Sequence, residues 1–284
     1  MVQLVVDSGC DLPDEFLRKY QIPVLPHSVS VGKDAFDDQR NPAQMAHFYS
    51  LNLIDRSRQV TSGPASEGTI EQVLSKQLAK GHDDIVVQPI NAANSPTYAN
   101  AQAVAKKLGG DAKQIHTVDS HTLFSGQGLL ALYTLSLIQK GLSGAQIKSR
   151  AEEFGRKIVG YAAIQDVYYL RERGRQKNEK SVSWLKAFMA RSLSLHPIVA
   201  MTYQGSTVAD TVKTYDGCTQ RLFELAMEKI QGDSLLMPAI VVSVAGPLSS
   251  LEKVPGFKAL EKVAAEHKVK IYRSVMSLSG GINL

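Results

Sequence analysis

The chain has 284 residues, of which 44% are hydrophobic and 21% are charged, and its formal net charge is +5 at pH 7. This composition is typical of a globular protein with a full apolar core, and a modest positive charge spread along the chain argues against nucleic acid as the default partner. Two cysteines, no signal-peptide pattern and no apolar run long enough to span a bilayer argue against a disulfide scaffold and a membrane protein, and predict a cytoplasmic location.

The first half of the chain alternates short apolar runs with helical patterns. Strands are predicted at residues 2–6, 83–90 and 114–118, because these runs are rich in Val and Ile and lead into polar loops. The extended segment 22–31 contains two prolines and is therefore expected at a sheet edge. Helices are predicted at residues 13–20, 43–51, 70–78, 97–108 and 126–140. This alternation predicts an α/β domain with a mainly parallel sheet over residues 1–160.

The pattern changes after a further helix that begins at Ser143. Two β-type runs on either side of a Gln-Gly-Ser turn predict a hairpin. The predicted elements from there on are strands at 197–202 and 207–213, a helix at about 216–230, a strand at 239–244, a helix at about 257–268 and a strand at 269–276. This order predicts a second, α+β domain over residues 161–284.

Hydroxyl-rich loops follow or precede the predicted elements of the first half. Because open α/β sheets bind ligands outside the carboxyl ends of their strands, we expect these loops to converge on one crevice. Their hydroxyl residues are Ser8, Thr61, Ser62, Ser95, Thr97 and Ser120. Neutral donors beside helix N-termini suit a carboxylate or a phosphate, whereas the loops hold no carboxylate cluster for a metal. The simpler alternative is that Asn94 or Ser95 only caps the helix that begins near Pro96.

Other chemistries have weaker support in the sequence. Residues 126–131 fit the dinucleotide pattern G-x-G-x-x-A, but the first glycine lies well beyond the end of its strand, and helix packing is the simpler use for it. The sequence has no phosphate-binding loop and no G-x-S-x-G nucleophile elbow, and its histidines lack metal-ligand spacing. His121 is a candidate base in the crevice. In the basic run 171–180, Arg175 is the candidate for ligand or partner contact.

Five segments, in order over nearly the whole chain, resemble the DegV family. They are Asp7 to Pro13, Thr61 to Ser66, Asn91 to Tyr98, Asp119 to Gly128 and Leu170 to Arg175. The first three are similar to the family's Asp-Ser-x-x-Asp-Leu-Pro, Thr-Ser-Gln-Pro-Ser and Ser-Ser-x-Leu-Ser-Gly-Thr-Tyr. The last two resemble its Asp-Ser with Gly-x-Gly and its Leu-x-x-Gly-Gly-Arg. Pro96 and Arg173 stand where the family has glycine.

The resemblance implies a fatty-acid-binding protein similar to the FakB subunits of bacterial fatty acid kinase, with a DegV-type fold. It implies that the carboxylate lies on Thr61, Ser62, Ser95 and Thr97, with Arg175 as a nearby cation and the acyl chain in an apolar tunnel between the two domains. It also implies that the chain is not an enzyme and holds no cofactor or metal. The partner would be a separate ATP-dependent kinase that makes the acyl phosphate.

The resemblance is incomplete in the last residues. The family usually closes with His-Thr-Gly-Pro-Gly, whereas this chain has Ser-Leu-Ser-Gly-Gly at residues 277–281. We expect Ser277 or His121 to supply part of the polar contact that the missing histidine would make. The rival hypothesis is an enzyme that acts on a small carboxylate or phosphate substrate in the same crevice.

Overall fold

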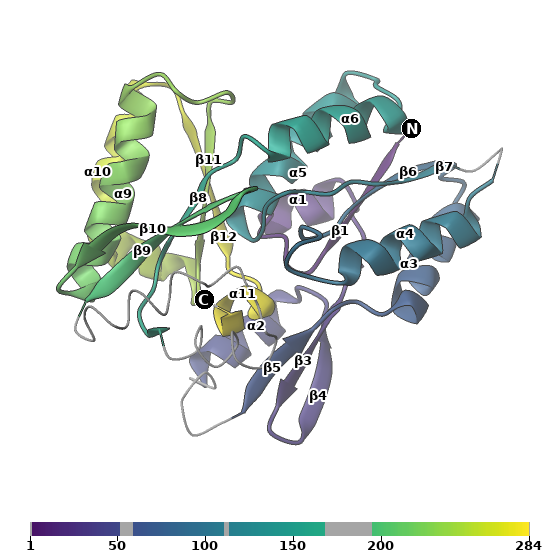
Figure 1. Cartoon of the computed structure of the whole chain (residues 1–284), viewed down its shortest axis with the longest axis horizontal. Coiled ribbons are helices and arrows are strands. Elements are labelled where there is room, and N and C mark those ends of the chain that lie inside the picture. Colours follow the sequence, from purple (N-terminus) through teal and green to yellow (C-terminus); the bar gives the residue numbers. More distant parts are fainter. Residues whose placement is uncertain (1, 52–58, 111–113, 168–194, 284) are drawn as a thin grey trace.

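The computed structural model of this chain describes residues 2–51, 59–110, 114–167 and 195–283 (Figure 1). Its central sheet has four parallel strands in the order β2, β1, β6 and β7. These strands span Val24–Leu25, Gln3–Asp7, Asp84–Gln88 and Gln114–Thr117, respectively. The structure confirms the predicted α/β class with a parallel sheet. The edge position predicted for residues 22–31 is correct for β2 but wrong for residues 27–31, which form the central strand of a second sheet.

Helices cover both faces of this sheet, because its strands are apolar on both sides. Leu4 and Val6 pack into one core with side chains of α1, α5 and α6. Val5 points the other way and packs with α3 and α4. The side chains therefore alternate between two cores along β1, as the period of a strand requires. The helices span Asp14–Lys19 (α1), Glu67–Ala79 (α3), Thr97–Leu108 (α4), Ser125–Gln139 (α5) and Gly144–Gly155 (α6).

A second sheet in the first half is antiparallel, and it was not predicted. Its strands are β4 (Asp34–Asp38), β3 (His27–Val31) and β5 (Val60–Gly63), in that order. The prediction of a loop from Thr61 was therefore wrong, because its first residues pair with β3. A Val-Thr-Ser-Gly run has no alternating apolar pattern, so its strand conformation depends on the partner strand. Helix α2 (Pro42–Ser50) begins where predicted.

The second half combines an antiparallel sheet with a parallel strand pair. Strands β8, β9 and β10 form the antiparallel sheet, in which β9 and β10 are the predicted hairpin. Strands β11 and β12 are parallel and lie between α5 on one side and α9 and α10 on the other (Figure 1). The elements span Gly160–Ala163 (β8), His196–Thr202 (β9), Gly205–Val212 (β10), Tyr215–Gln231 (α9), Ala239–Val244 (β11), Leu248–Lys253 (the 3-10 helix η2), Phe257–Glu266 (α10) and Lys270–Val275 (β12).

A short helix, α11 (Leu278–Asn283), follows β12 and returns to the first half of the chain, where it packs against β3 and β5. The division of the chain into two domains at residue 160 stays a prediction. Across the described ranges, none of the helices is long and apolar enough to cross a membrane.

Gly128 allows α5 to approach the loop after β1 closely. A Cβ atom at this position would lie 2.6 Å from the carbonyl oxygen of Asp11. We expect Gly128→Ala to lower the free energy of unfolding by about 1–3 kcal/mol, as in other overpacked cores, in urea denaturation experiments. Gly68→Ala in α3 is the matched control, because Ser66 Oγ, at 4.0 Å, is its nearest neighbour. Equal losses in the two variants would contradict the role of Gly128.

Candidate functional site

The hydroxyl groups of Ser95 and Thr97 lie at the start of α4, and Ser62 lies near the end of β5, three residues before Ala65, whose N–H contacts Thr97. These three residues are here called the hydroxyl cluster. Thr97 is fully buried, and its Oγ1 accepts a hydrogen bond from the Ala65 N–H at 3.3 Å. Thr97 Oγ1 lies 2.9 Å from Ser95 Oγ, which also accepts from the Thr97 N–H. Pro96 precedes the helix without a side-chain cap, so Thr97 is its first residue. Ser62 and Ser95 are only partly buried, so a ligand can reach them.

Ser62 and Thr61 are separated by their position on a strand. Ser62 pairs with Val29, which is buried in a core shared with α11, and Ser62 Oγ accepts a hydrogen bond from Asn283 Nδ2 at 2.8 Å. Thr61 pairs with Ser30, one position along. Because successive side chains of a strand point to opposite faces, the structure brings Ser62 to α11 and directs Thr61 away from it.

His27, at the start of β3, is buried beside the hydroxyl cluster and is only 4% exposed. Its Nε2 lies 3.2 Å from Asp7 Oδ2 and 3.5 Å from Thr97 Oγ1. Its Nδ1 lies 3.2 Å from Ser279 Oγ on α11. One side chain thus connects the end of β1, the start of α4 and α11. Sequence reasoning assigned this histidine no role, because it lacks metal-ligand spacing and no short motif marks it.

Helix α11 contacts both the hydroxyl cluster and a large cavity. Leu278 and Ile282 anchor the helix in an apolar core. Asn283 bonds Ser62 of the cluster, as described above, whereas Gly281 lines the cavity. The short helix therefore reaches both, although Ser62, Ser95 and Thr97 are not among the residues that line the cavity.

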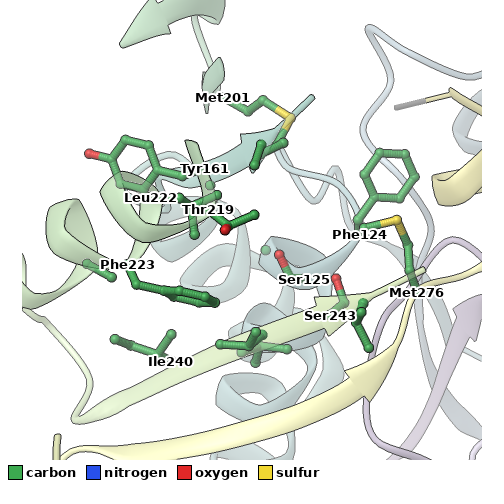
Figure 2. A pocket seen from close by; sticks show the side chains of 18 of the residues that line it. Phe124, Ser125, Tyr161, Met201, Thr219, Leu222, Phe223, Ile240, Ser243 and Met276 are labelled. Carbon is green, nitrogen blue, oxygen red and sulfur yellow. The ribbon is translucent and has the colours of Figure 1, made fainter. Parts of the chain in front are cut away.

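The cavity has a volume of about 1310 Å³ and lies between the start of α5 and the elements of the second half. Figure 2 shows Phe124 and Met276 at one end, Phe223 and Ile240 toward the other, and the hydroxyl of Ser125 between them. This volume exceeds the range of about 300–1,000 Å³ that is usual for small-molecule pockets. An elongated apolar ligand fits such a lining.

A buried ion pair connects the loop after β1 to the residues just before α11. Arg40 Nη1 lies 3.2 Å from Asp11 Oδ1, and both side chains are fully inaccessible to solvent. Arg40 also donates to the Val275 carbonyl at 3.1 Å, and Asp11 accepts from the Ser277 N–H at 2.8 Å. Burial raises the pKa of Asp11 above its usual value, although Arg40 acts to lower it. Sequence reasoning missed Arg40, because nothing in its local pattern distinguishes it from a surface arginine.

The structure places the secondary candidates away from the hydroxyl cluster or in structural roles. Ser8 Oγ accepts from the His27 N–H, Ser120 Oγ donates to the Thr122 carbonyl, and Ser277 Oγ accepts from the Gly280 N–H. His121 lies beside Asp119, Arg156 and the ring of Tyr203 rather than beside Thr97. Arg175 lies outside the described residues.

The cluster has the chemistry of an anion site built from uncharged donors. Hydroxyl groups can donate to a carboxylate without a neighbouring metal. No group of three or more His, Cys, Asp or Glu side chains that could hold a metal ion occurs in the part of the chain that the structure describes.

Comparisons with known proteins give consistent matches over the full length. The family model described as "Uncharacterised protein, DegV family" matches residues 1–284. A DegV domain-containing protein of Xanthomonas axonopodis pv. citri is 31% identical over 296 residues, which cover 100% of this chain and 94% of that protein.

Solved structures with this fold include the following two. A stearic-acid-binding protein from Eubacterium ventriosum has a TM-score of 0.81 at 18% identity, over 100% of this chain and 94% of that one. DegV of Bacillus subtilis, described as a fatty acid binding protein, has a TM-score of 0.78 at 21% identity, over 100% of this chain and 95% of that one.

Proposed function

This chain belongs to the DegV family, and from that membership we propose that it binds one long-chain fatty acid. The observation that carries the proposal is the cavity of about 1310 Å³, which shares the helix α11 with a cluster of uncharged hydroxyl donors. The fatty-acid-binding descriptions of the relatives from Eubacterium ventriosum and Bacillus subtilis support the same ligand class.

The acyl chain occupies the cavity in this proposal. Burial of each methylene group contributes about 0.8 kcal/mol, so a long chain gains on the order of 10 kcal/mol from leaving water. Loss of translational and rotational freedom opposes this gain by roughly 4–15 kcal/mol. A long chain is therefore needed for tight binding, and short carboxylic acids should bind weakly.

The carboxylate accepts hydrogen bonds from Ser62 and Ser95 at the edge of α11, and Thr97 supports Ser95 from the buried side. Ser62 and Ser95 are partly exposed, which leaves the carboxylate accessible to a second protein. We propose that the chain itself is not catalytic and presents the carboxylate to an ATP-dependent fatty acid kinase, which forms the acyl phosphate.

Mass spectrometry of organic extracts from the purified protein tests the proposal. We expect one copurifying fatty acid, and reversible binding of oleate or palmitate by the delipidated protein in isothermal titration calorimetry. Repeated absence of lipid together with no binding of either acid would overturn fatty acid binding. Turnover of a small carboxylate or phosphate substrate by the protein alone would favour the rival enzyme. The kinase role is tested separately, by acyl phosphate formation with ATP and a fatty acid kinase.

A further inference from the structure

We propose that His27 sets the direction of the hydrogen bonds in the hydroxyl cluster, so that Ser95 offers its proton to the ligand and the site selects an ionised carboxylate over an uncharged head group. This inference rests on the proposed function, and it gives His27 a positioning role in head-group selection. It goes beyond the ligand class, because it concerns how the protein distinguishes a fatty acid from an alcohol of the same chain.

The direction of these hydrogen bonds is set first at Asp7, whose carboxylate acts only as an acceptor toward His27. Asp7 Oδ1 accepts from the Gly9 N–H at 3.1 Å and from Gln127 Nε2 at 2.9 Å. Asp7 Oδ2 accepts from the Ile90 N–H at 2.6 Å and lies 3.2 Å from His27 Nε2. Because N–H donors surround both oxygens, the proton in the contact with His27 belongs to Nε2. Neutral and protonated forms of the imidazole both satisfy this requirement.

The same Nε2 lies 3.5 Å from Thr97 Oγ1, which is a weak second contact. The Ala65 N–H already occupies one acceptor position of that hydroxyl at 3.3 Å. Because His27 Nε2 carries a proton, it cannot accept from the Thr97 hydroxyl, which has to direct its own proton elsewhere. Ser95 Oγ, at 2.9 Å, is the partner in reach. Without His27, either hydroxyl could donate to the other.

Ser95 therefore acts as an acceptor toward the protein. Its Oγ receives the Thr97 hydroxyl proton and the Thr97 N–H, the latter at 3.3 Å. Its own proton is then directed toward the partly exposed side of the cluster. Ser62 is arranged in the same way, since its Oγ accepts from Asn283 Nδ2. Two O–H donors suit a carboxylate, because its oxygens only accept hydrogen bonds. An alcohol also donates one hydrogen bond, for which these two hydroxyls offer no acceptor of matching direction.

The test compares the Kd values of oleate and oleyl alcohol, measured for wild type and for variants by displacement of a fluorescent fatty acid. We expect His27→Leu to lower the preference for oleate by about 10-fold or more, which is the worth of one hydrogen bond to a charged group. His27→Gln keeps an N–H donor and should retain the preference to within about 3-fold. A purely structural role would weaken both ligands equally and leave the ratio unchanged.

Thr97→Val provides an independent arm if His27→Leu does not fold, because it removes the connecting hydroxyl while keeping the side-chain shape. It should reduce the same preference, and the double variant should lose no more than either single variant. An unchanged ratio in the folded variants, with normal oleate binding by wild type, would overturn the inference and leave the proposed function intact. Failure of the wild-type protein to bind oleate would overturn both.

Discussion

Arg40→Met is expected to lower the free energy of unfolding by about 3–5 kcal/mol, because it leaves the buried charge of Asp11 without its partner. Methionine has a similar length and keeps the apolar contacts of the arginine stem. The substitution also removes the donors to the Ser8 and Val275 carbonyls. Urea denaturation followed by circular dichroism measures the loss.

Arg221→Met in α9 is the control for the loss of an arginine with ion pairs. Arg221 contacts Asp210, Glu224 and Glu228, but its side chain is 31% exposed. Exposed pairs contribute about 0–1 kcal/mol, so this variant should be nearly as stable as wild type. The double variant Arg40→Met, Asp11→Asn should recover part of the lost stability, because no unpaired charge remains. Similar small losses for Arg40→Met and Arg221→Met would show that the buried pair is unimportant.

The loss in Arg40→Met should also depend on pH. Burial raises the pKa of Asp11, and removal of Arg40 removes an influence that lowers it. A carboxyl whose pKa is higher in the folded than in the unfolded state binds its proton more tightly when folded, so its contribution favours folding at low pH and is lost as the pH rises. The difference between Arg40→Met and wild type is therefore expected to shrink from about pH 8 to about pH 5. A constant difference would indicate that Asp11 is not the group left unpaired.

The double variant Ser62→Ala, Ser95→Ala is expected to bind oleate at least about 100-fold more weakly than wild type. Each hydroxyl donates to a charged acceptor in the proposed complex, and such a bond contributes about 1.5–3 kcal/mol. Ser62 lies on a strand, and Pro96 rather than Ser95 holds the N-cap position of α4, so the variant should remain folded. Isothermal titration calorimetry with delipidated protein measures the affinity.

Ser66→Ala is the matched control for this loss. Its hydroxyl lies in the same segment as Ser62 but caps α3 by accepting from the Thr69 N–H. We expect this variant to lose about 1 kcal/mol of stability and to keep its affinity for oleate. Wild-type affinity in the Ser62→Ala, Ser95→Ala variant would place the carboxylate away from the hydroxyl cluster.

The parallel sheet could be predicted from the sequence because its strands are apolar and separated by helices with clear signals. Asn41 illustrates such a signal: its side chain accepts from two N–H groups at the start of α2. The antiparallel sheet could not be predicted in the same way. Strand β5 has little apolar character of its own and is held by pairing with β3, a partner 29 to 35 residues away.

The candidate site was predictable only in part for the same reason. Hydroxyl-rich loops indicated Ser62, Ser95 and Thr97 because short motifs contain them. His27 and Arg40 act through partners far along the chain, so no local pattern reveals their environment. The adjacent residues Thr61 and Ser62 looked equivalent in the sequence, and only the strand conformation separates their directions.

The hydrogen bonds that join the first 30 residues to the segment around α11 affect the order in which the protein folds. The Ser277 N–H reaches Asp11 across a sequence separation of 266 residues, and Ser279 reaches His27 across 252. Contacts of such long range form late, because closing a large loop precedes any gain from the contact. During synthesis, the parallel sheet of the first half has all its strands early, whereas the hydroxyl cluster acquires its α11 partners only after residues 277–283 have emerged. Ligand binding should therefore report completion of the fold.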